Sequence, residues 1–280
     1  MTLPDISVTS SSSGRPDMGQ AIRLWRTALD APAVLPVITL LAVIGVWELA
    51  TIVFGIPTYM LPAPSRILLT GFGEIDAWRW AEHVWATLRV ALIGYFLSIF
   101  IAIPIAIMLT KSKTLSRAFY PILVVVQSTP IVAVAPIIIV VLGSGDAPRI
   151  VITCLITFFP LVVSTATGLM ATPPELIELS RSLRAPVWRE ITQIRLPYAV
   201  PYIFSALKIS VTLAVIGAVV AEFVAAEKGI GYFIQFATSF FKLPQAWAGL
   251  GVLVLMSLLL FQLVALVQRV FFRWSLPEGQ

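Results

Sequence analysis

Residues 90–110 read VALIGYFLSIFIAIPIAIMLT, an apolar run without one charged side chain. A helix needs about 20 mostly apolar residues to cross the roughly 30 Å hydrocarbon core of a bilayer, because each residue rises 1.5 Å. This stretch is therefore predicted to be a membrane-spanning helix.

The composition of the whole chain agrees with this prediction. Of its 280 residues, 59% are hydrophobic and only 12% are charged, and the mean hydropathy is +0.96. About a quarter of the residues in a soluble domain are charged. So few charges cannot coat a soluble globule, and this class is excluded. The single cysteine and single histidine exclude a Cys/His metal cluster, and we expect no metal site.

Five further stretches have the length and composition of a span. Those at 118–145, 150–174 and 243–268 are free of charge, 33–54 contains only Glu48, and 199–223 contains only Lys208 and Glu222. We predict an all-α polytopic membrane protein with six transmembrane helices, at about 33–54, 88–110, 119–143, 149–171, 199–223 and 245–268. The membrane domain would cover residues 31–280.

The distribution of Lys and Arg predicts the orientation of these spans. Short cytoplasmic loops carry an excess of basic residues. The termini and the loops on their side hold Arg15, Arg23, Arg26, Lys111, Lys113, Arg117, Arg181, Arg184, Arg189, Arg195, Arg269 and Arg273. The other side holds only half as many, so both termini are predicted to be cytoplasmic. Residues 1–30 lack apolar periodicity and are expected to form a mobile cytoplasmic tail, and the first span is expected to remain as an anchor.

One long cytoplasmic loop, residues 172–198, combines dense charge with signals for helix ends. Thr172 is predicted to cap a helix that begins at Pro173, with Glu175 completing a capping box. Pro186 should end this helix near Arg184 and allow a second one over 187–194. Glu178 can pair with Arg181 at i, i+3. The resulting hairpin can dock in a groove of a soluble partner or lie on the bilayer surface as a covering loop, and the physics alone favours neither.

The residues of this loop resemble the EAA loop of bacterial ABC importer permeases. The shared pattern consists of Glu178 and, at the correct spacing, Ile194, Leu196 and Pro197. Leu179 and Ser180 replace two alanines, and Arg184 replaces a glycine that would suit a left-handed turn. Arg184 either takes an ordinary turn or adds a charge to the docking surface.

Further similarity covers residues 57–274 and points to the nitrate, sulfonate and taurine branch of these permeases. It rests on LPAPS at 61–65, STPIVAVAP at 128–136, AEF at 221–223 and GIGY at 229–232. The resemblance implies a type I importer permease fold of the methionine-importer type, with a five-helix core and an extra N-terminal helix. It also implies a bacterial inner membrane location and an assembly of two permease subunits, expected to be a homodimer, with two ATPase subunits and an extracytoplasmic substrate-binding protein. No nucleic-acid partner is expected.

The chain lacks a G-x-x-x-x-G-K-[ST] loop, so it cannot cradle nucleotide phosphates and is not expected to be an enzyme. ATP and Mg would belong to the partner ATPase, leaving no cofactor here. The resemblance implies that the loop docks in a cleft of that ATPase. The expected contact residues are Glu178, Arg181, Ser182, Leu183, Arg184 and Ala185.

Polar residues inside the third and fifth spans are candidates for a translocation pathway. Gln127, Ser128 and Thr129 adjoin Pro130, where backbone hydrogen bonding is loosened. This patch suits a pore wall or a packed kink whose hydroxyls bond back to carbonyls. Glu222 is either a pathway residue or a carboxylate at the external interface.

Two function classes remain after a membrane enzyme is set aside for want of a catalytic motif. The leading one is the permease subunit of an ATP-driven importer, and the alternative is an ion-gradient-driven secondary transporter, which would need intramembrane acids that are scarce here. Residues 207–222 look more like permeases for thiamine-precursor pyrimidines or riboflavin than like those for sulfonate, taurine or nitrate.

Overall fold

The structure is a computed structural model that describes residues 34–276. The tail predicted at 1–30 lies outside the described residues. The chain divides into two units, Met1–Pro57 and Thr58–Gln280. In the first unit, α2 (Val34–Val53) is a single apolar helix in which Thr51 donates a hydrogen bond of 2.7 Å to the carbonyl of Glu48. Most of its large side chains are exposed, as suits a helix surrounded by lipid.

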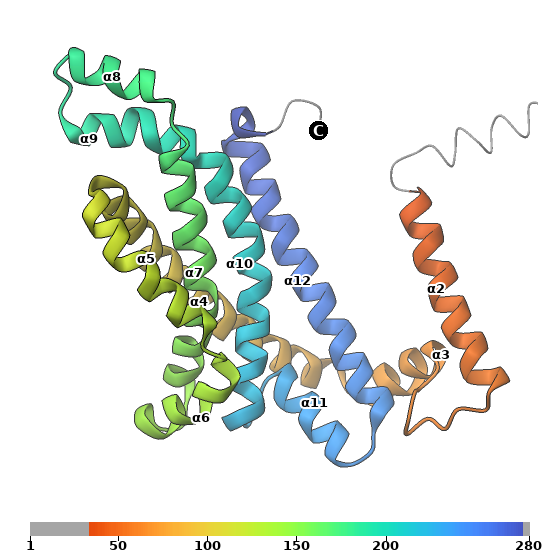
Figure 1. Ribbon diagram of the computed structural model, residues 1–280. Helices are drawn as coiled ribbons and strands as arrows, with labels where there is room; N and C mark the ends of the chain where they lie inside the picture. Colours follow the sequence, from red (N-terminus) through yellow and green to blue (C-terminus); the bar gives the residue numbers. More distant parts are fainter. Residues whose placement is uncertain (1–33, 277–280) are drawn as a thin grey trace, which may run out of the picture. The chain divides into compact units, whose positions relative to one another are not determined.

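The second unit is built from long helices (Figure 1). They are α4 (Ala77–Lys111), α5 (Lys113–Ser128), α6 (Ile131–Leu142), α7 (Asp146–Met170), α10 (Leu196–Ala225) and α12 (Leu243–Phe271). Shorter elements are α3 (Pro64–Arg66), η1 (Ile67–Phe72), α8 (Pro174–Ser182), α9 (Val187–Arg189), η2 (Glu190–Arg195), α11 (Ile230–Ser239) and η3 (Arg273–Ser275). Within residues 34–276, five helices are long and apolar enough to cross a membrane, and a bent pair makes a sixth. This agrees with the predicted six spans.

The predicted third span is the bent pair. α5 and α6 meet at an angle of 92° around Thr129 and Pro130. Thr129 is extended, with φ −76° and ψ 122°. The residue before a proline is pushed out of the α region by the proline ring. The predicted span over 119–143 is therefore bent at Pro130, where the sequence indicates loosened backbone hydrogen bonding.

The segment before the second span is not one interfacial helix. Its tryptophans through Trp85 suit the membrane interface, and Ser65 suits an N-cap by residue type. Instead, Ala63 is the N-cap residue of α3, and α4 begins as early as Ala77. Trp80 packs between Phe72 and Phe233, with ring centroids 5.3 and 4.9 Å away, so this end of α4 is a packed part of the bundle.

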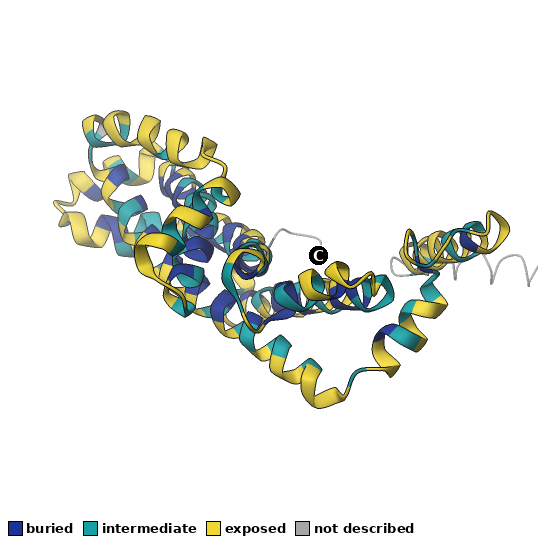
Figure 2. Cartoon of the chain, turned by 90° about the horizontal axis from the view of Figure 1, so that it is seen from below, coloured by how far each residue is buried: buried dark blue, intermediate teal, exposed yellow. Residues whose placement is uncertain are grey.

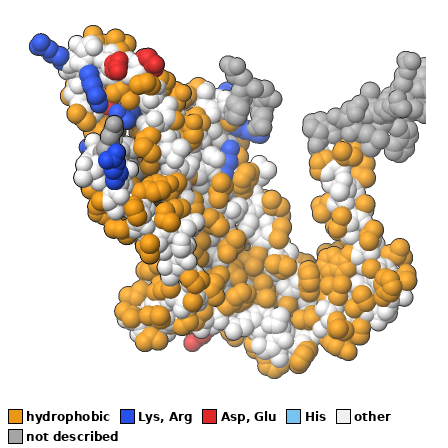
Figure 3. Space-filling model, in the orientation of Figure 1, with side chains coloured by type: hydrophobic (Ala, Val, Ile, Leu, Met, Phe, Trp, Pro, Cys, Tyr) orange, Lys and Arg blue, Asp and Glu red, His pale blue; other side chains and the backbone are white. Residues whose placement is uncertain are grey.

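The core forms where α7 packs against both α4 and α10. Small residues allow the close approach. A Cβ on Gly94 of α4 would lie 2.6 Å from the Cβ of Thr153 in α7, and one on Gly217 of α10 would lie 2.9 Å from the Cα of the same threonine. Figure 2 shows buried residues on the facing sides of these helices and exposed residues on the outer sides. On the face shown in Figure 3, hydrophobic side chains cover much of the bundle, while Lys and Arg gather toward the end that carries α8 and α9.

Candidate functional site

The hairpin is formed by α8, the turn at 183–186, α9 and η2 (Figure 1). Its first arm starts differently from the prediction. α8 begins at Pro174 with Pro173 as its N-cap residue, and no side chain caps it. Thr172 is buried, and its hydroxyl donates instead to the carbonyl of Leu169, 3.2 Å away. The predicted capping box is wrong because Thr172 is drawn into the end of α7.

The turn of the hairpin is a Schellman motif. The amide of Ala185 donates to the carbonyl of Ser180 at 3.0 Å, and the amide of Arg184 donates to that of Arg181 at 2.9 Å. Arg184 has φ 53°, which is the left-handed region. An L-residue with a side chain pays about 1–2 kcal/mol there. Arg184 thus keeps the backbone geometry of the glycine it replaces, and the ordinary turn that the sequence allowed is not formed.

The expected docking residues lie together around this turn. Glu178, Arg181, Ser182, Leu183 and Arg184 are exposed, and Ala185 is half-buried. Large apolar side chains around them also face outward, with Leu183 73% and Trp188 71% exposed. A shallow groove of 350 Å³ between the arms is lined by Leu176, Leu179, Ser180, Leu183, Arg184, Ala185, Pro186, Arg189, Gln193 and Ile194. An exposed apolar surface with basic flanks is typical of a site for a protein partner.

The ion pairs of the hairpin are not the ones that spacing suggested. Arg181 lies 3.7 Å from Glu190 on the second arm, in place of the predicted partner Glu178. Glu190 is buried, and it was absent from the sequence-based candidates. The second arm also continues through η2 into α10, so the second predicted helix and the fifth span form one continuous helical stretch over Val187–Ala225, which changes direction between α9 and α10 (Figure 1).

The polar patch of the third span lies at the α5–α6 bend. Gln127, Ser128 and Thr129 are all exposed there. The hydroxyls of Ser128 and Thr129 donate back to the carbonyls of Val124 and Val125, at 2.8 and 3.1 Å. The patch thus combines the back-bonded kink with an accessible polar surface.

Glu222 lies at the end of the bundle opposite the hairpin, and it is fully buried. Its Oε2 accepts a hydrogen bond of 2.7 Å from the amide of Gly231. The two preceding amides donate to side chains of α4, Gly229 to His83 Nδ1 at 3.2 Å and Ile230 to Thr87 Oγ1 at 2.8 Å. Three side chains from two helices therefore satisfy the N-terminal amides of α11. Glu222 is therefore a capping residue for α11 at this end of the bundle.

Neither α11 nor the capping role of His83 was predicted from the sequence. The signal was available in the two glycines at 229 and 231. A Cβ on Gly229 would overlap the carboxylate of Glu222, and one on Gly231 would lie 2.9 Å from its Cβ. A G-x-G pair beside a buried acid marks a close approach of backbone to carboxylate.

Ion pairs surround this opposite end. Asp146 pairs with Arg89 and, at 3.1 Å, with Arg149. Lys228 pairs with Glu82 at 2.5 Å, and this carboxylate raises the pKa of Lys228. Among residues 34–276, no group of three or more His, Cys, Asp or Glu side chains could hold a metal ion.

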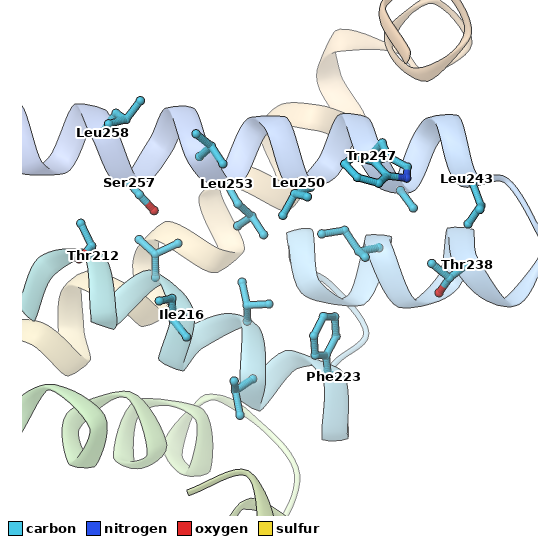
Figure 4. Close-up of a pocket in the computed structure, with 16 residues that line it drawn as sticks. Thr212, Ile216, Phe223, Thr238, Leu243, Trp247, Leu250, Leu253, Ser257 and Leu258 are labelled. Carbon is cyan, nitrogen blue, oxygen red and sulfur yellow. The ribbon is translucent and has the colours of Figure 1, made fainter. Parts of the chain in front are cut away.

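An apolar groove of 710 Å³ runs between α10, α11 and α12 (Figure 4). Its lining includes the aromatic rings of Phe223 and Trp247, and the hydroxyls of the lining residues Thr212 and Thr238 donate back to carbonyls of their own helices. None of the described residues that line it is charged. It can accept apolar and aromatic groups and offers no cation to an anionic one.

Residues 94–275 match the family model of the binding-protein-dependent transport system inner membrane component. The riboflavin transport system permease protein RibX of Chloroflexus aurantiacus is 32% identical over 85% of this chain and 89% of its own length. The formylaminopyrimidine transport permease protein ThiX of Halalkalibacterium halodurans is 31% identical over 85% of this chain and 95% of its own. The taurine transport system permease protein TauC of Escherichia coli is 27% identical, with 89% and 93% covered.

Solved structures show the same fold. An inward facing conformation of the MetNI methionine ABC transporter aligns with a TM-score of 0.60 at 20% identity, covering 72% of this chain and 100% of that chain. An amino acid ABC transporter aligns with a TM-score of 0.56, covering 67% and 91%. The predicted permease fold of the methionine-importer type is confirmed.

Proposed function

The chain belongs to the family of binding-protein-dependent transport system inner membrane components and is the permease subunit of an ABC importer, and we propose that two copies form its translocation pathway. Membership of this family argues against the alternative, an ion-driven secondary transporter. In this proposal, a separate binding protein delivers the substrate on one side of the inner membrane. Two ATPase subunits, which hold ATP and Mg, drive transport from the cytoplasmic side, where both termini lie.

One observation supports coupling through the hairpin more than any other. The tip exposes Leu183 and Trp188 together with Arg181 and Arg184, and the arm behind it is continuous with the span α10. An exposed apolar and basic surface is suited to a groove on a protein partner. The backbone is helical throughout Val187–Ala225, so a displacement of the hairpin turn can move α10.

For the substrate, we propose a riboflavin-like or thiamine-precursor pyrimidine compound, ahead of sulfonate, taurine or nitrate. RibX and ThiX, named for riboflavin and formylaminopyrimidine transport, are more similar to this chain than TauC is. The groove beside α10 has an apolar lining with two aromatic rings, which suits an uncharged ring system. We further propose that Gln127, Ser128 and Thr129 border the pathway at the α5–α6 bend.

The coupling proposal is tested by charge reversal on α8, which we call the docking helix. Glu178→Lys is expected to lower binding-protein-stimulated ATP hydrolysis in proteoliposomes, because it places a cation where the partner faces a carboxylate. Glu227→Lys makes the same change at an exposed position of the opposite end and is the matched control for ATPase recovery, because this end faces the binding protein in the proposal. Recovery of the ATPase with the tagged chain is measured for both variants. Equal recovery and hydrolysis in Glu178→Lys and wild type would contradict docking at this helix.

The substrate proposal is tested separately. The binding protein that stimulates this permease is purified, and its ligand is identified by mass spectrometry. A heteroaromatic ligand is the expected result. A sulfonate or an inorganic anion would overturn the substrate assignment and leave the coupling proposal standing.

A further inference from the structure

A buried carboxylate lies inside the hairpin, behind its docking surface. Glu190 and Glu222 are the two acidic side chains that are buried among residues 34–276, and Glu190 is 8% exposed. A carboxylate removed from water is costly unless cations and donors satisfy it. Its partners therefore show what holds it there.

The two oxygens of Glu190 bind different parts of the hairpin. Oε1 accepts a hydrogen bond of 2.8 Å from Nε of Arg195 and lies 2.7 Å from Nη2 of the same ion-paired guanidinium. Oε2 lies 3.7 Å from Nε of Arg181, which belongs to α8. Arg195 is nearly buried, with 14% of its side chain exposed, whereas Arg181 is 69% exposed. One carboxylate thus connects α8, the docking helix, to the N-terminal end of α10.

The connection depends on the π-helical form of η2. Glu190 and Arg195 are five residues apart, and in an α-helix such residues point about 140° away from each other. In a π-helix the backbone bonds also join residues five apart, so the two side chains face the same side. η2 covers Glu190–Arg195 and continues directly into α10, for which Arg195 is the N-cap residue. The wide turn therefore fixes the carboxylate to the first turn of the span.

The ion pairs also restrict how the two arms can move. The turn at 183–186 is the covalent link between the arms, and a turn alone can act as a hinge. A second link from Arg181 to Glu190, on the other side of the turn, opposes changes in the angle between α8 and η2. A buried ion pair is often no more stabilising than an apolar pair of the same size. An apolar pair in place of Glu190 and Arg195 could not fix this angle, because it would offer no negative charge to Arg181.

We propose that Glu190 is a positioning residue that joins α8 to α10 through Arg181 and Arg195, so that a displacement of the docking helix moves the span as one body. This inference rests on the proposed coupling of the hairpin to an ATPase. Glu190 itself does not touch the partner. Loss of its charge should leave docking intact and impair the transmission of movement.

Three variants of the chain distinguish a role of Glu190 in transmitting movement from a contribution to stability alone. Glu190→Gln keeps the size of the side chain and removes its charge. The double variant Glu190→Leu with Arg195→Met replaces the ion pair by apolar side chains of similar volume and restores packing. Glu227→Gln makes the first change at an exposed position and is the matched control.

Transport is measured in proteoliposomes with the co-purified ATPase, as substrate taken up per ATP hydrolysed. We expect Glu190→Gln to recover the ATPase as well as wild type does and to lose about fivefold or more of its coupled uptake, the usual range for an energetic link between two sites. The double variant should regain thermal stability and not regain uptake. Uptake at the wild-type level in either variant would overturn the proposal, and so would loss of ATPase recovery in Glu190→Gln.

A distance measurement tests the tie without any ATPase. Spin labels are placed at Glu175→Cys on α8 and Tyr198→Cys on α10, both exposed positions, in a Cys154→Ala background. The distance distribution should be narrow and should broaden when Glu190→Gln is added. An unchanged distribution would overturn the tie. If the distribution broadens while wild type recovers no ATPase, the proposed coupling has failed, and the transmission role falls with it.

Discussion

Gly229→Ala should be among the most damaging single-methyl additions in this chain. Gly229 has φ 128° and ψ 162°, a conformation that is essentially restricted to glycine and costs other residues about 1–3 kcal/mol. The added Cβ would also overlap the carboxylate of Glu222. Moving this side chain breaks its 2.7 Å hydrogen bond to Gly231, and a hydrogen bond of this kind contributes about 0.5–1.5 kcal/mol. The two effects add to about 1.5–4.5 kcal/mol.

Gly251→Ala is the matched control. Gly251 lies inside α12, and a Cβ there meets nothing within 4 Å. Alanine in a helix interior is about 0.5–1 kcal/mol more favourable than glycine, so this variant should be as stable as wild type or slightly more so. Gly231→Ala should fall between the two, because its Cβ would approach Glu222 to 2.9 Å without a positive φ.

The assay is denaturation of the purified chain by SDS in mixed micelles, followed by tryptophan fluorescence. Trp80 packs on Phe233 of α11, so its emission reports on this end of the bundle. The free energy of unfolding is extrapolated linearly to zero denaturant. Equal unfolding free energies for Gly229→Ala and Gly251→Ala would refute the inferred packing of Glu222 against the start of α11.

Two further predictions concern a turn and an ion pair. Arg184→Gly should raise the free energy of unfolding by up to about 1 kcal/mol, since relief of the left-handed strain is partly offset by the freedom of glycine in the unfolded chain. Arg189→Gly, the same change inside a helix, should lower it by about 1 kcal/mol, and the reverse order in thermal denaturation would contradict the turn geometry. Lys228→Met should remove a pH dependence of stability. Glu82 raises the pKa of Lys228 above 10.5. The pair therefore contributes its full stability below pH 10.5 and loses it as the pH rises through the raised pKa. Unfolding curves of wild type and Lys228→Met that differ by the same amount at pH 8 and at pH 12 would speak against this pair.

The membrane class, the six apolar spans and the family pattern could all be predicted from the sequence. Burial in lipid requires long apolar runs, and such runs are visible without a structure. The turn at Arg184 was located from the chain alone, because Pro186 and the EAA spacing set its place. Its left-handed conformation at a residue with a side chain could not be predicted from the residue type.

Other features required the tertiary structure. Thr172 looked like a helix cap, but its hydroxyl bonds to Leu169 at the end of α7. The sequence showed no partner for Glu222, and the fold brings the first turn of α11 to its carboxylate. Glu190 and Arg195 stand at a spacing that separates side chains on an α-helix, and only the π-helical turn brings them together. Apolar periodicity is a local property of the chain, so the sequence determined the spans. The partners of buried polar groups come from different helices, or from a departure from α-helical geometry, so only the folded chain decided them.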